Sequence, residues 1–333
     1  MKYTLSPELI EDTWYGKNIL SLLLIPVSWL YKTFMMLRRL AYISGILPVQ
    51  QVSVPVIVVG NITVGGAGKT PLIIWLAEFL KSQGLQPGVI SRGYGGTVKQ
   101  WPQQVRPDSN PFIVGDEPVL IAQRTQCPVA ISPQRYDAAK ALTEHTDCDV
   151  LLCDDGLQHY SLYRDMELVV IDGIRRFGNG RCLPAGPLRE PATRLRRVDM
   201  LICNGWGGKN EHHMEYVTLN PRALNNDDKQ KDIELFKEQT VHAVAGIGNP
   251  ERFFSYLRGK KINIIKHVFP DHHPYKAEDL QFMDSLPVVM TEKDAVKCRS
   301  FADDRCWYLP IEARMTSAFQ HRFTILLKDI MNG

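Results

Sequence analysis

The stretch Thr63-Val-Gly-Gly-Ala-Gly-Lys69-Thr70 limits most strongly what this chain can fold into, because of the segments on either side of it. Before it, the run VSVPVIVVG (52–60) is apolar and β-branched, which is typical of a buried parallel strand. After it, residues 70–84 space their apolar side chains as a helix does and end at Gly84. A strand, a glycine-rich turn and a helix in this order predict a phosphate-binding loop.

Each position of the loop has a physical role. Glycines let backbone N–H groups approach phosphate oxygens, and the helix N-terminus adds partial positive charge. Lys69 is expected to reach the β- and γ-phosphates, and Thr70 to offer its hydroxyl to Mg²⁺. Thr63 stands where the general pattern has glycine. The predicted nucleotide-binding residues are Thr63, Val64, Gly65, Gly66, Ala67, Gly68, Lys69 and Thr70.

Further strands and helices alternate after the loop. The predicted strands lie within 87–96, 128–132, 149–155, 166–172 and 198–204, and the helices at 70–84, 117–125 and 134–144. Such alternation predicts an α/β fold with a parallel sheet and helices on both faces. The polar stretches after Asn204 read as turns or loops, and a second alternating series begins near Thr240. The predicted organisation is therefore an N-terminal segment (1–47), a P-loop domain (48–205) and a smaller C-terminal α/β domain (206–333).

An acidic pair follows one of these strands. Val150-Leu-Leu-Cys-Asp154-Asp155 is an apolar run that ends in two carboxylates, as expected for the metal-side partner of a phosphate loop. Adjacent side chains at a strand end point in different directions, so only one of Asp154 and Asp155 is expected to touch Mg²⁺. A turn that merely ends in acids is the structural alternative.

The N-terminal segment is apolar and basic. Residues 17–47 contain Lys17, Lys32, Arg38 and Arg39 and no acidic residue. At 100° per residue the face Lys17, Ser21, Ser28, Lys32 and Arg39 opposes a surface of leucines and aromatics. This pattern indicates a helix lying in a membrane interface with its basic groups toward anionic headgroups, kinked at Pro26. A helix packed on the protein's own core and a tilted single span are the alternatives.

Composition excludes other classes. The 39 basic and 36 acidic side chains nearly balance, so no general electrostatic case for nucleic-acid binding exists. The seven cysteines form no C-x-x-C pair, which favours reduced thiols in the cytosol over disulfides or zinc. Whether the protein forms oligomers does not follow from the sequence.

Three classes of P-loop protein compete with a kinase. A translational-type GTPase needs a lysine where this chain has Glu292 in Thr291-Glu-Lys293-Asp294. A partition-type ATPase needs a lysine where Val64 stands. A regulatory or structural NTPase module would not need the polar sequence motifs that this chain carries outside the loop. The non-lipid alternative is a P-loop kinase or NTPase that acts on a soluble sugar or nucleoside, which the N-terminal segment disfavours.

Seven strings in order give a more specific indication. They are VGNITVGGAGKTP (59–71), SRGYGG (91–96), VGDEP (114–118), DDGLQH (154–159), LPAGPLRE (183–190), FPDHHPY (269–275) and TEKDAVK (291–297). Together they resemble the tetraacyldisaccharide 4′-kinase family over most of the chain. The resemblance implies transfer of the ATP γ-phosphate to the 4′-hydroxyl of a tetraacyldisaccharide 1-phosphate, which gives the lipid A precursor lipid IVA. It also implies work at the cytosolic face of the bacterial inner membrane.

The same strings suggest roles in catalysis. A sugar hydroxyl is a poor nucleophile at neutral pH, so a carboxylate that accepts its proton helps. Asp116 is the candidate base, as the resemblance also suggests, and His272 is expected to hold it or share its proton. Glu117 is a candidate Mg²⁺ partner with Asp155. Since Asp116 and His272 fall in different predicted domains, closure of the two domains is expected to complete the site and exclude water.

The lipid carries its own phosphate, so cationic recognition groups are expected. The predicted substrate-binding residues are Arg92, Tyr94, Arg135, Gln158, His159, Arg189 and Glu190. The arginines suit phosphate and the others suit sugar hydroxyls. For each of them a solvated or structural role is the alternative.

Overall fold

The structure is a computed structural model that describes residues 7–16 and 18–332, and the chain separates into two compact units. Unit 1 is formed by the chain up to Lys69, by Asp147–Glu215 and by the chain from Met315 onward. Unit 2 is formed by Thr70–Thr146 and Tyr216–Arg314. The domain limits predicted from composition, 48–205 and 206–333, are continuous segments and remain a prediction.

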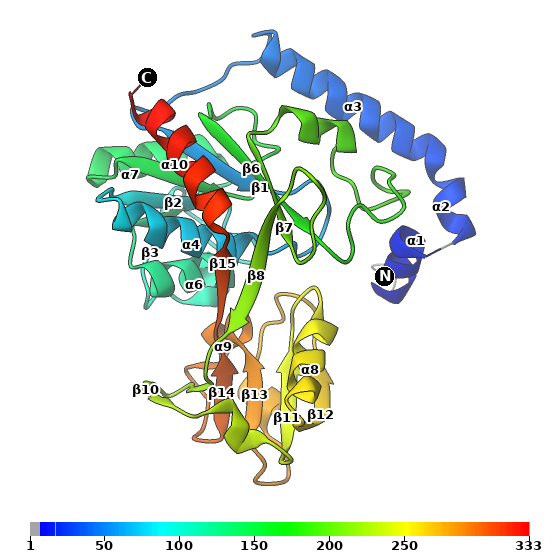
Figure 1. The fold of residues 1–333 in the computed structure, drawn as a ribbon, viewed down its shortest axis with the longest axis vertical. Helices are drawn as coiled ribbons and strands as arrows, with labels where there is room; N and C mark the ends of the chain where they lie inside the picture. Colours follow the sequence, from blue (N-terminus) through cyan, green and yellow to red (C-terminus); the bar gives the residue numbers. More distant parts are fainter. Residues whose placement is uncertain (1–6, 17, 333) are drawn as a thin grey trace. The chain divides into compact units, whose positions relative to one another are not determined.

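Unit 1 is built on parallel strands in the order β8-β7-β6-β1-β5 (Figure 1). Their bounds are β1 (Val56–Gly60), β5 (Val150–Asp154), β6 (Met166–Asp172), β7 (Met200–Asn204) and β8 (His212–Thr218), which runs past the end of the unit. Every residue of β1 and β5 is buried, as a strand covered on both faces requires. The helices are α1 (Pro7–Tyr15), α2 (Ile19–Leu23), α3 (Ile25–Ile43), the 3₁₀ turn η1 (Ala192–Arg197) and α10 (Ser317–Asn332).

The N-terminal helices differ from the sequence prediction in two respects. Pro26 lies in the first turn of α3, where proline fits, so the chain breaks at Leu24 between two helices and no single helix is kinked. The serines of the polar face also point inward. The hydroxyls of Ser21 and Ser28 are buried and donate to the carbonyls of Ala185 and Cys182. The face predicted to turn its basic groups toward lipid headgroups therefore buries its serines, whereas its Lys32 is exposed. Lys17 lies outside the described residues.

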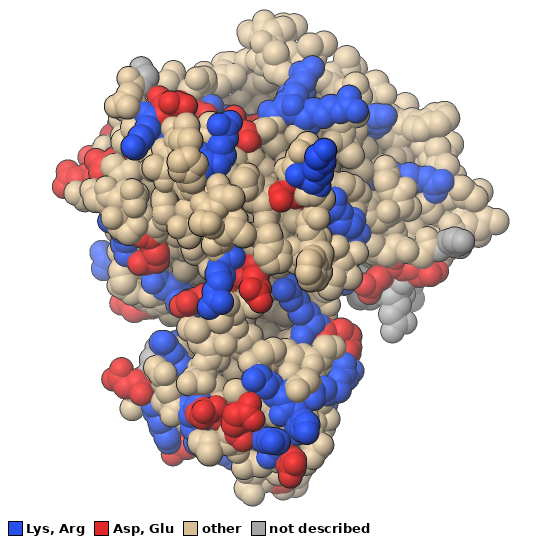
Figure 2. Space-filling view, in the orientation of Figure 1, with Lys and Arg blue, Asp and Glu red and all other residues tan. Residues whose placement is uncertain are grey.

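The opposite face of α2 and α3 is apolar and exposed. The exposed side chains are Ile19, Leu22, Leu23, Val27, Trp29, Leu30, Phe34, Met36, Leu37, Leu40 and Ile43. In Figure 2 the surface over α3 is mostly uncharged, and the charges that interrupt it are basic. Within residues 7–16 and 18–332, every helix is too short or too polar to cross a membrane.

The first part of unit 2 continues the alternating pattern. It holds α4 (Lys69–Ser82), β2 (Pro87–Ser91), β3 (Gln103–Val105), α5 (Pro111–Val114), α6 (Asp116–Thr125), β4 (Val129–Ile131) and α7 (Arg135–His145). β2 pairs with β4 in parallel, and the short β3 pairs with β4 antiparallel.

The second part is a six-stranded sheet in the order β10-β9-β14-β13-β11-β12. Its strands are β9 (Arg222–Ala223), β10 (Asn226–Gln230), β11 (Thr240–Ala245), β12 (Asn263–Val268), β13 (Val288–Thr291) and β14 (Cys306–Leu309), followed by β15 (Ile311–Met315). Its helices are α8 (Pro250–Gly259) and α9 (Glu292–Cys298), with 3₁₀ turns η2 (Ile233–Phe236) and η3 (Ala277–Leu280).

Side chains alternate between the two faces of this sheet. Val241 and Ala243 pack with Phe254 of α8, whereas Val244 packs in a separate cluster with Ala295 of α9. The two helices therefore cover opposite faces. The predicted α/β class with parallel strands is confirmed, although part of the polar sequence expected to form loops is strand β8, β9 or β10.

Candidate active site

The glycine loop of unit 1 has an open backbone. Gly65 and Gly68 have φ angles of +105° and +102°, which side chains disfavour. A Cβ built on Gly65 or Gly66 would meet no atom within 4 Å. The Val64 N–H donates to the Pro187 carbonyl, which fixes the start of the loop. The space over Gly65 and Gly66 is therefore free for a ligand.

Lys69 ends the loop and begins α4. Its Nζ lies 3.5 Å from Oδ1 of Asn61 and 3.5 Å from Oδ1 of Asp155, and its side chain is mostly buried. Thr70 follows within the first turn of the helix. A lysine and a helix N-terminus at one end of a glycine loop make a site for an anion.

The two predicted metal-side carboxylates differ. Asp154 ends β5, next to β1, and is buried. Asp155 has a positive φ of 49°, and both its oxygens accept from Nη1 of Arg189, at 3.0 and 2.9 Å. Arg189, predicted to hold substrate phosphate, thus pairs with Asp155 in this structure, and both roles stay predictions.

The predicted sugar-binding group of unit 1 is largely engaged within the protein. Gln158 donates to Glu190 at 2.9 Å, and Glu190 is buried between the Tyr160 hydroxyl and Arg194. Burial and the Glu190 charge raise the pKa of Tyr160 to about 12. The carbonyl of His159 accepts from Arg164. Glu190 therefore has a structural role here, while Gln158 and His159 are partly exposed.

Asp116 of unit 2 lies at the first turn of α6 and is buried. Nδ1 of His272 lies 2.9 Å from Oδ1 and 3.1 Å from Oδ2 of this carboxylate. Burial alone raises the pKa of Asp116, but the His272 hydrogen bond and the charges of Lys293, His272 and Lys297 outweigh it and lower the pKa to about 2. The carboxylate is therefore ionised at neutral pH, and the predicted pairing of Asp116 with His272 is present.

Backbone geometry fixes both partners of this pair. Gly115, just before Asp116, has a φ of +97°, and a Cβ there would lie 2.8 Å from the Tyr94 carbonyl oxygen. His272 itself has a positive φ of 60°, an uncommon conformation that is enriched at functional sites. The exposed ring of Tyr94 meets the His272 ring edge-on, with centroids 5.1 Å apart.

Glu117, predicted as a metal partner, is paired with a cation. Nζ of Lys293 donates to Glu117 at 2.8 Å and to Asp271 at 3.1 Å. Although burial lowers the pKa of Lys293, the charges of Glu117, Asp116 and Asp271 raise it overall. Among the described residues no three His, Cys, Asp or Glu side chains are grouped to hold a metal ion.

The other two arginines predicted to bind substrate differ in their exposure to solvent. Arg92 is exposed just after β2, whereas Arg135 is buried at the start of α7 and donates to the Ser132 carbonyl at 3.0 Å. Arg135 therefore has a structural contact, and its predicted role in substrate binding remains untested.

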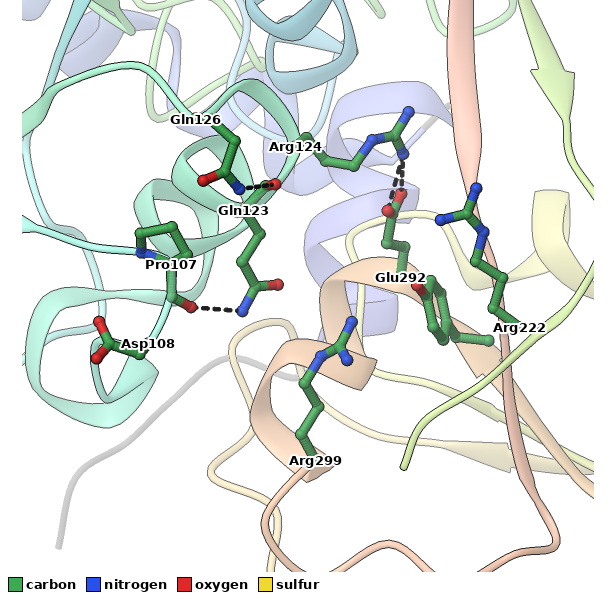
Figure 3. A pocket seen from close by; sticks show the side chains of 9 residues that line it. Pro107, Asp108, Gln123, Arg124, Gln126, Arg222, Glu292 and Arg299 are labelled. Carbon is green, nitrogen blue, oxygen red and sulfur yellow. Dashed lines mark hydrogen bonds and ion pairs between the residues drawn. The ribbon is translucent and has the colours of Figure 1, made fainter. Parts of the chain in front are cut away.

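Helix α6 is tied to α9 by an ion pair in which one guanidinium nitrogen faces both carboxylate oxygens. Nη1 of Arg124 donates to both oxygens of Glu292, at 2.8 and 2.9 Å. Figure 3 shows this pair at a pocket that Arg222 and Arg299 also line. Arg124 lies in the last turn of α6 and Glu292 at the start of α9. At the first turn of α6, Lys293 and Lys297 of α9 contact Glu117 and Asp116.

Sequence reasoning did not assign these two lysines to the site, nor Asn61 beside Lys69. The signal for the lysines was available. In TEKDAVK, Lys293 and Lys297 are four residues apart, which places them on one face of a helix. Asn61 carried no comparable pattern.

Together, the open glycine loop between β1 and α4, its lysine and the carboxylates at the end of the neighbouring β5 define a P-loop nucleotide-binding protein. A family model described as tetraacyldisaccharide-1-P 4′-kinase matches residues 20–328. The chain belongs to this family, which confirms the resemblance seen in the sequence.

Individual relatives agree. The chain is 50% identical over 321 residues to a tetraacyldisaccharide 4′-kinase of Nitrosococcus oceani, covering 96% of this chain and 95% of that protein. It is 52% identical over 300 residues to that of Alkalilimnicola ehrlichii, covering 89% of each. The crystal structure of LpxK from Aquifex aeolicus in complex with ATP matches with a TM-score of 0.78 and 28% identity, covering 94% of this chain and 99% of that one.

Proposed function

We propose that this chain transfers the γ-phosphate of ATP to the 4′-hydroxyl of a tetraacyldisaccharide 1-phosphate, the step that yields lipid IVA. The observation that carries the proposal is the family match over residues 20–328 together with the open glycine loop that ends at Lys69. The relative from Aquifex aeolicus was crystallised with ATP, which supports the choice of nucleotide.

The loop would bind the triphosphate. Backbone N–H groups of Gly65 to Gly68 and the N-terminus of α4 would receive phosphate oxygens, and Lys69 would contact the β- and γ-phosphates. Nζ of Lys69 lies 3.5 Å from Oδ1 of Asp155, so a bound phosphate and this carboxylate would compete for the same ammonium group.

Magnesium would neutralise charge on the β- and γ-phosphates when bound. Its proposed ligands are the hydroxyl of Thr70 and the carboxylates of Asp154, Asp155 and Glu117. All are oxygen donors, and a Mg²⁺ ion that binds phosphates needs only one or two carboxylates because it keeps several waters. A bound ion would compete with Arg189 for Asp155 and with Lys293 for Glu117.

Asp116 would accept the proton of the sugar hydroxyl, and His272 would orient it. A carboxylate with a lowered pKa is a weak base, but phosphoryl transfer through a loose transition state releases the proton late, so a positioned acceptor suffices. Arg92, Tyr94 and Arg135 of unit 2, and Gln158, His159, Arg189 and Glu190 of unit 1, remain the proposed contacts of the lipid's phosphate and sugars.

We also propose that α2 and α3 bring the protein to the cytosolic face of the inner membrane. The acyl chains cannot leave a bilayer cheaply, since burial of each CH₂ is worth about 0.8 kcal/mol. The apolar face of these helices is exposed, and the chain has no acidic residue between Asp12 and Glu78 that an anionic lipid surface would repel. The serines underneath hold the helices on unit 1 in this orientation.

The direct test of the reaction is incubation of the full chain with γ-labelled ATP, Mg²⁺ and a tetraacyldisaccharide 1-phosphate in mixed micelles. Label should appear in the lipid and should be lost with Lys69→Ala. A parallel reaction with soluble sugars and nucleosides tests the alternative substrate class. Label in those acceptors and none in the lipid would overturn the proposal.

A further inference from the structure

Helix α9 carries three buried charged side chains, namely those of Glu292, Asp294 and Lys297. Lys297 is the most unusual of them, because only 3% of its side chain is exposed. A buried ammonium group is costly unless partners compensate its charge. Its partners therefore indicate what it is there to do.

Lys297 lies between two carboxylates. Its Nζ is 3.4 Å from Oδ2 of Asp116 and 3.2 Å from Oδ1 of Asp294. The Tyr275 ring covers the ammonium group, with 5.0 Å from Nζ to the ring centroid. All of these residues belong to unit 2.

Asp294 is held rigidly on its far side. Its Oδ2 accepts the Gly246 N–H at 2.9 Å and the Thr291 hydroxyl at 2.6 Å, which leaves Oδ1 toward Lys297. Gly246 is required for this approach, because a Cβ there would lie 2.7 Å from the Tyr275 hydroxyl and 3.0 Å from Oδ1 of Asp294. The backbone of β11, the cap of α9 and Asp294 thus set the position of the ammonium group.

The Asp116 carboxylate is contacted by three groups. Nδ1 of His272 lies 2.9 Å from Oδ1 and 3.1 Å from Oδ2, the Glu117 N–H donates to Oδ1 at 2.8 Å, and Nζ of Lys297 lies 3.4 Å from Oδ2. Lys297 is thus the charged partner on the Oδ2 side, and Lys293, one turn earlier on α9, donates to Glu117 at 2.8 Å. Two lysines spaced by one turn thus match two consecutive carboxylates.

We infer that Lys297, fixed by Asp294, is a positioning residue that sets the orientation of the Asp116 carboxylate for proton acceptance. This role rests on the proposed function of Asp116. Lys297 is buried, and it acts on the reaction through the Asp116 carboxylate that it contacts. A merely structural ion pair would stabilise unit 2 without affecting Asp116 selectively.

The test is a double-mutant cycle on the full chain with lipid and ATP. Lys297→Met keeps the length of the side chain and removes its charge. It should lower kcat about 10- to 100-fold, as a misplaced catalytic group does, with the KM values for ATP and lipid little changed. In an Asp116→Asn background the same substitution should have no further effect on kcat, because the carboxylate that Lys297 positions is already absent.

Two more variants make the outcome decisive. Lys276→Met is the matched control, since this lysine of the same unit is exposed, and its turnover should equal that of the wild type. Asp294→Asn loosens Lys297 without removing it and should give a smaller loss of kcat that is again absent in the Asp116→Asn background. If circular dichroism and thermal melting show that Lys297→Met does not fold, the Asp294→Asn variant replaces it in the cycle.

The possible failures can be told apart. If Asp116→Asn itself turns over normally, the proposed function of Asp116 fails and the inference with it. If Asp116→Asn is inactive while a folded Lys297→Met is as fast as the wild type, only the inference fails. Equal fractional losses from Lys297→Met in both backgrounds would show an independent structural effect and would also overturn it.

Discussion

Nδ1 of His272 lies 2.9 Å from Oδ1 of Asp116, although 156 positions of sequence separate the two residues. Both have unusual surroundings, since the histidine has a positive φ and the carboxylate follows a glycine that no side chain could replace. The pair therefore depends on two turns that only the folded unit brings together.

Asp116→Asn should lower kcat about 10²- to 10⁴-fold and leave nucleotide affinity nearly unchanged, because the amide keeps the shape of the carboxylate but cannot accept a proton. Steady-state kinetics and calorimetric titration with a non-hydrolysable ATP analogue measure the two quantities. Asp279→Asn is the control, since Asp279 of the same unit contacts His273 and caps the turn η3. Normal turnover by Asp116→Asn would exclude this residue as the proton acceptor.

The Asp116–His272 pair should make stability depend on pH. Burial lowers the pKa of His272, but the hydrogen bond and charge of Asp116 outweigh it, so the folded pKa is raised above 6.5. The contribution of this histidine is then complete below pH 6.5 and is lost as the pH rises through the folded pKa. Urea unfolding from pH 5.5 to 9 should show a gap between wild type and His272→Asn that narrows with rising pH.

Asparagine is the suitable replacement because it tolerates the positive φ at position 272. His273→Asn is the control for loss of a histidine ring, because His273 contacts Asp279 and not Asp116. A gap for His272→Asn that widened toward pH 9 would contradict the assigned direction of the pKa shift.

Two glycines with positive φ angles should separate folding from nucleotide binding. Gly65 and Gly84 both have positive φ angles and open space where a Cβ would go. Alanine at either position should cost about 1–2 kcal/mol of unfolding free energy through the backbone alone. Only Gly65→Ala should weaken ATP binding, because only that Cβ enters the proposed phosphate site. Equal ATP affinity in both variants would place the triphosphate elsewhere.

The apolar face of α3 should carry membrane binding. The triple substitution of Trp29, Leu30 and Phe34 by serine removes three exposed apolar side chains. Flotation with anionic phospholipid vesicles should show much weaker association, with ATP affinity unchanged. Trp206→Ser, which removes an exposed tryptophan outside these helices, should float as the wild type does. Undiminished flotation of the triple variant would refute the anchoring role.

Local sequence was sufficient where one physical effect dominated. The sequence runs of β1 and β5 are almost entirely apolar. Such runs beside a glycine loop predict parallel strands that are buried on both faces. The order of glycine loop, helix and acidic strand end could also be predicted, because phosphate binding depends on a backbone geometry that requires glycine.

The remainder depended on contacts between distant segments. Lys297 has the same polarity as an exposed lysine, and only Asp116 and Asp294 around it make its burial tolerable. The sequence predicts Ser21 and Ser28 on one face of a single helix, whereas they lie on α2 and α3 and are both buried. Serine suits either water or a buried carbonyl, so its polarity does not fix the direction of that face. The strands β9 and β10 are short and polar and carry no hydrophobic period.

The course of the chain also bears on how the protein can be dissected. It passes from one compact unit to the other at 69/70, 146/147, 215/216 and 314/315, so each unit is assembled from segments that are not contiguous in the gene. A stop codon or a proteolytic nick near residue 205 would leave both units incomplete. Fragments that begin or end there should express as unfolded polypeptide, and single substitutions in the intact polypeptide are the way to assign function to either half.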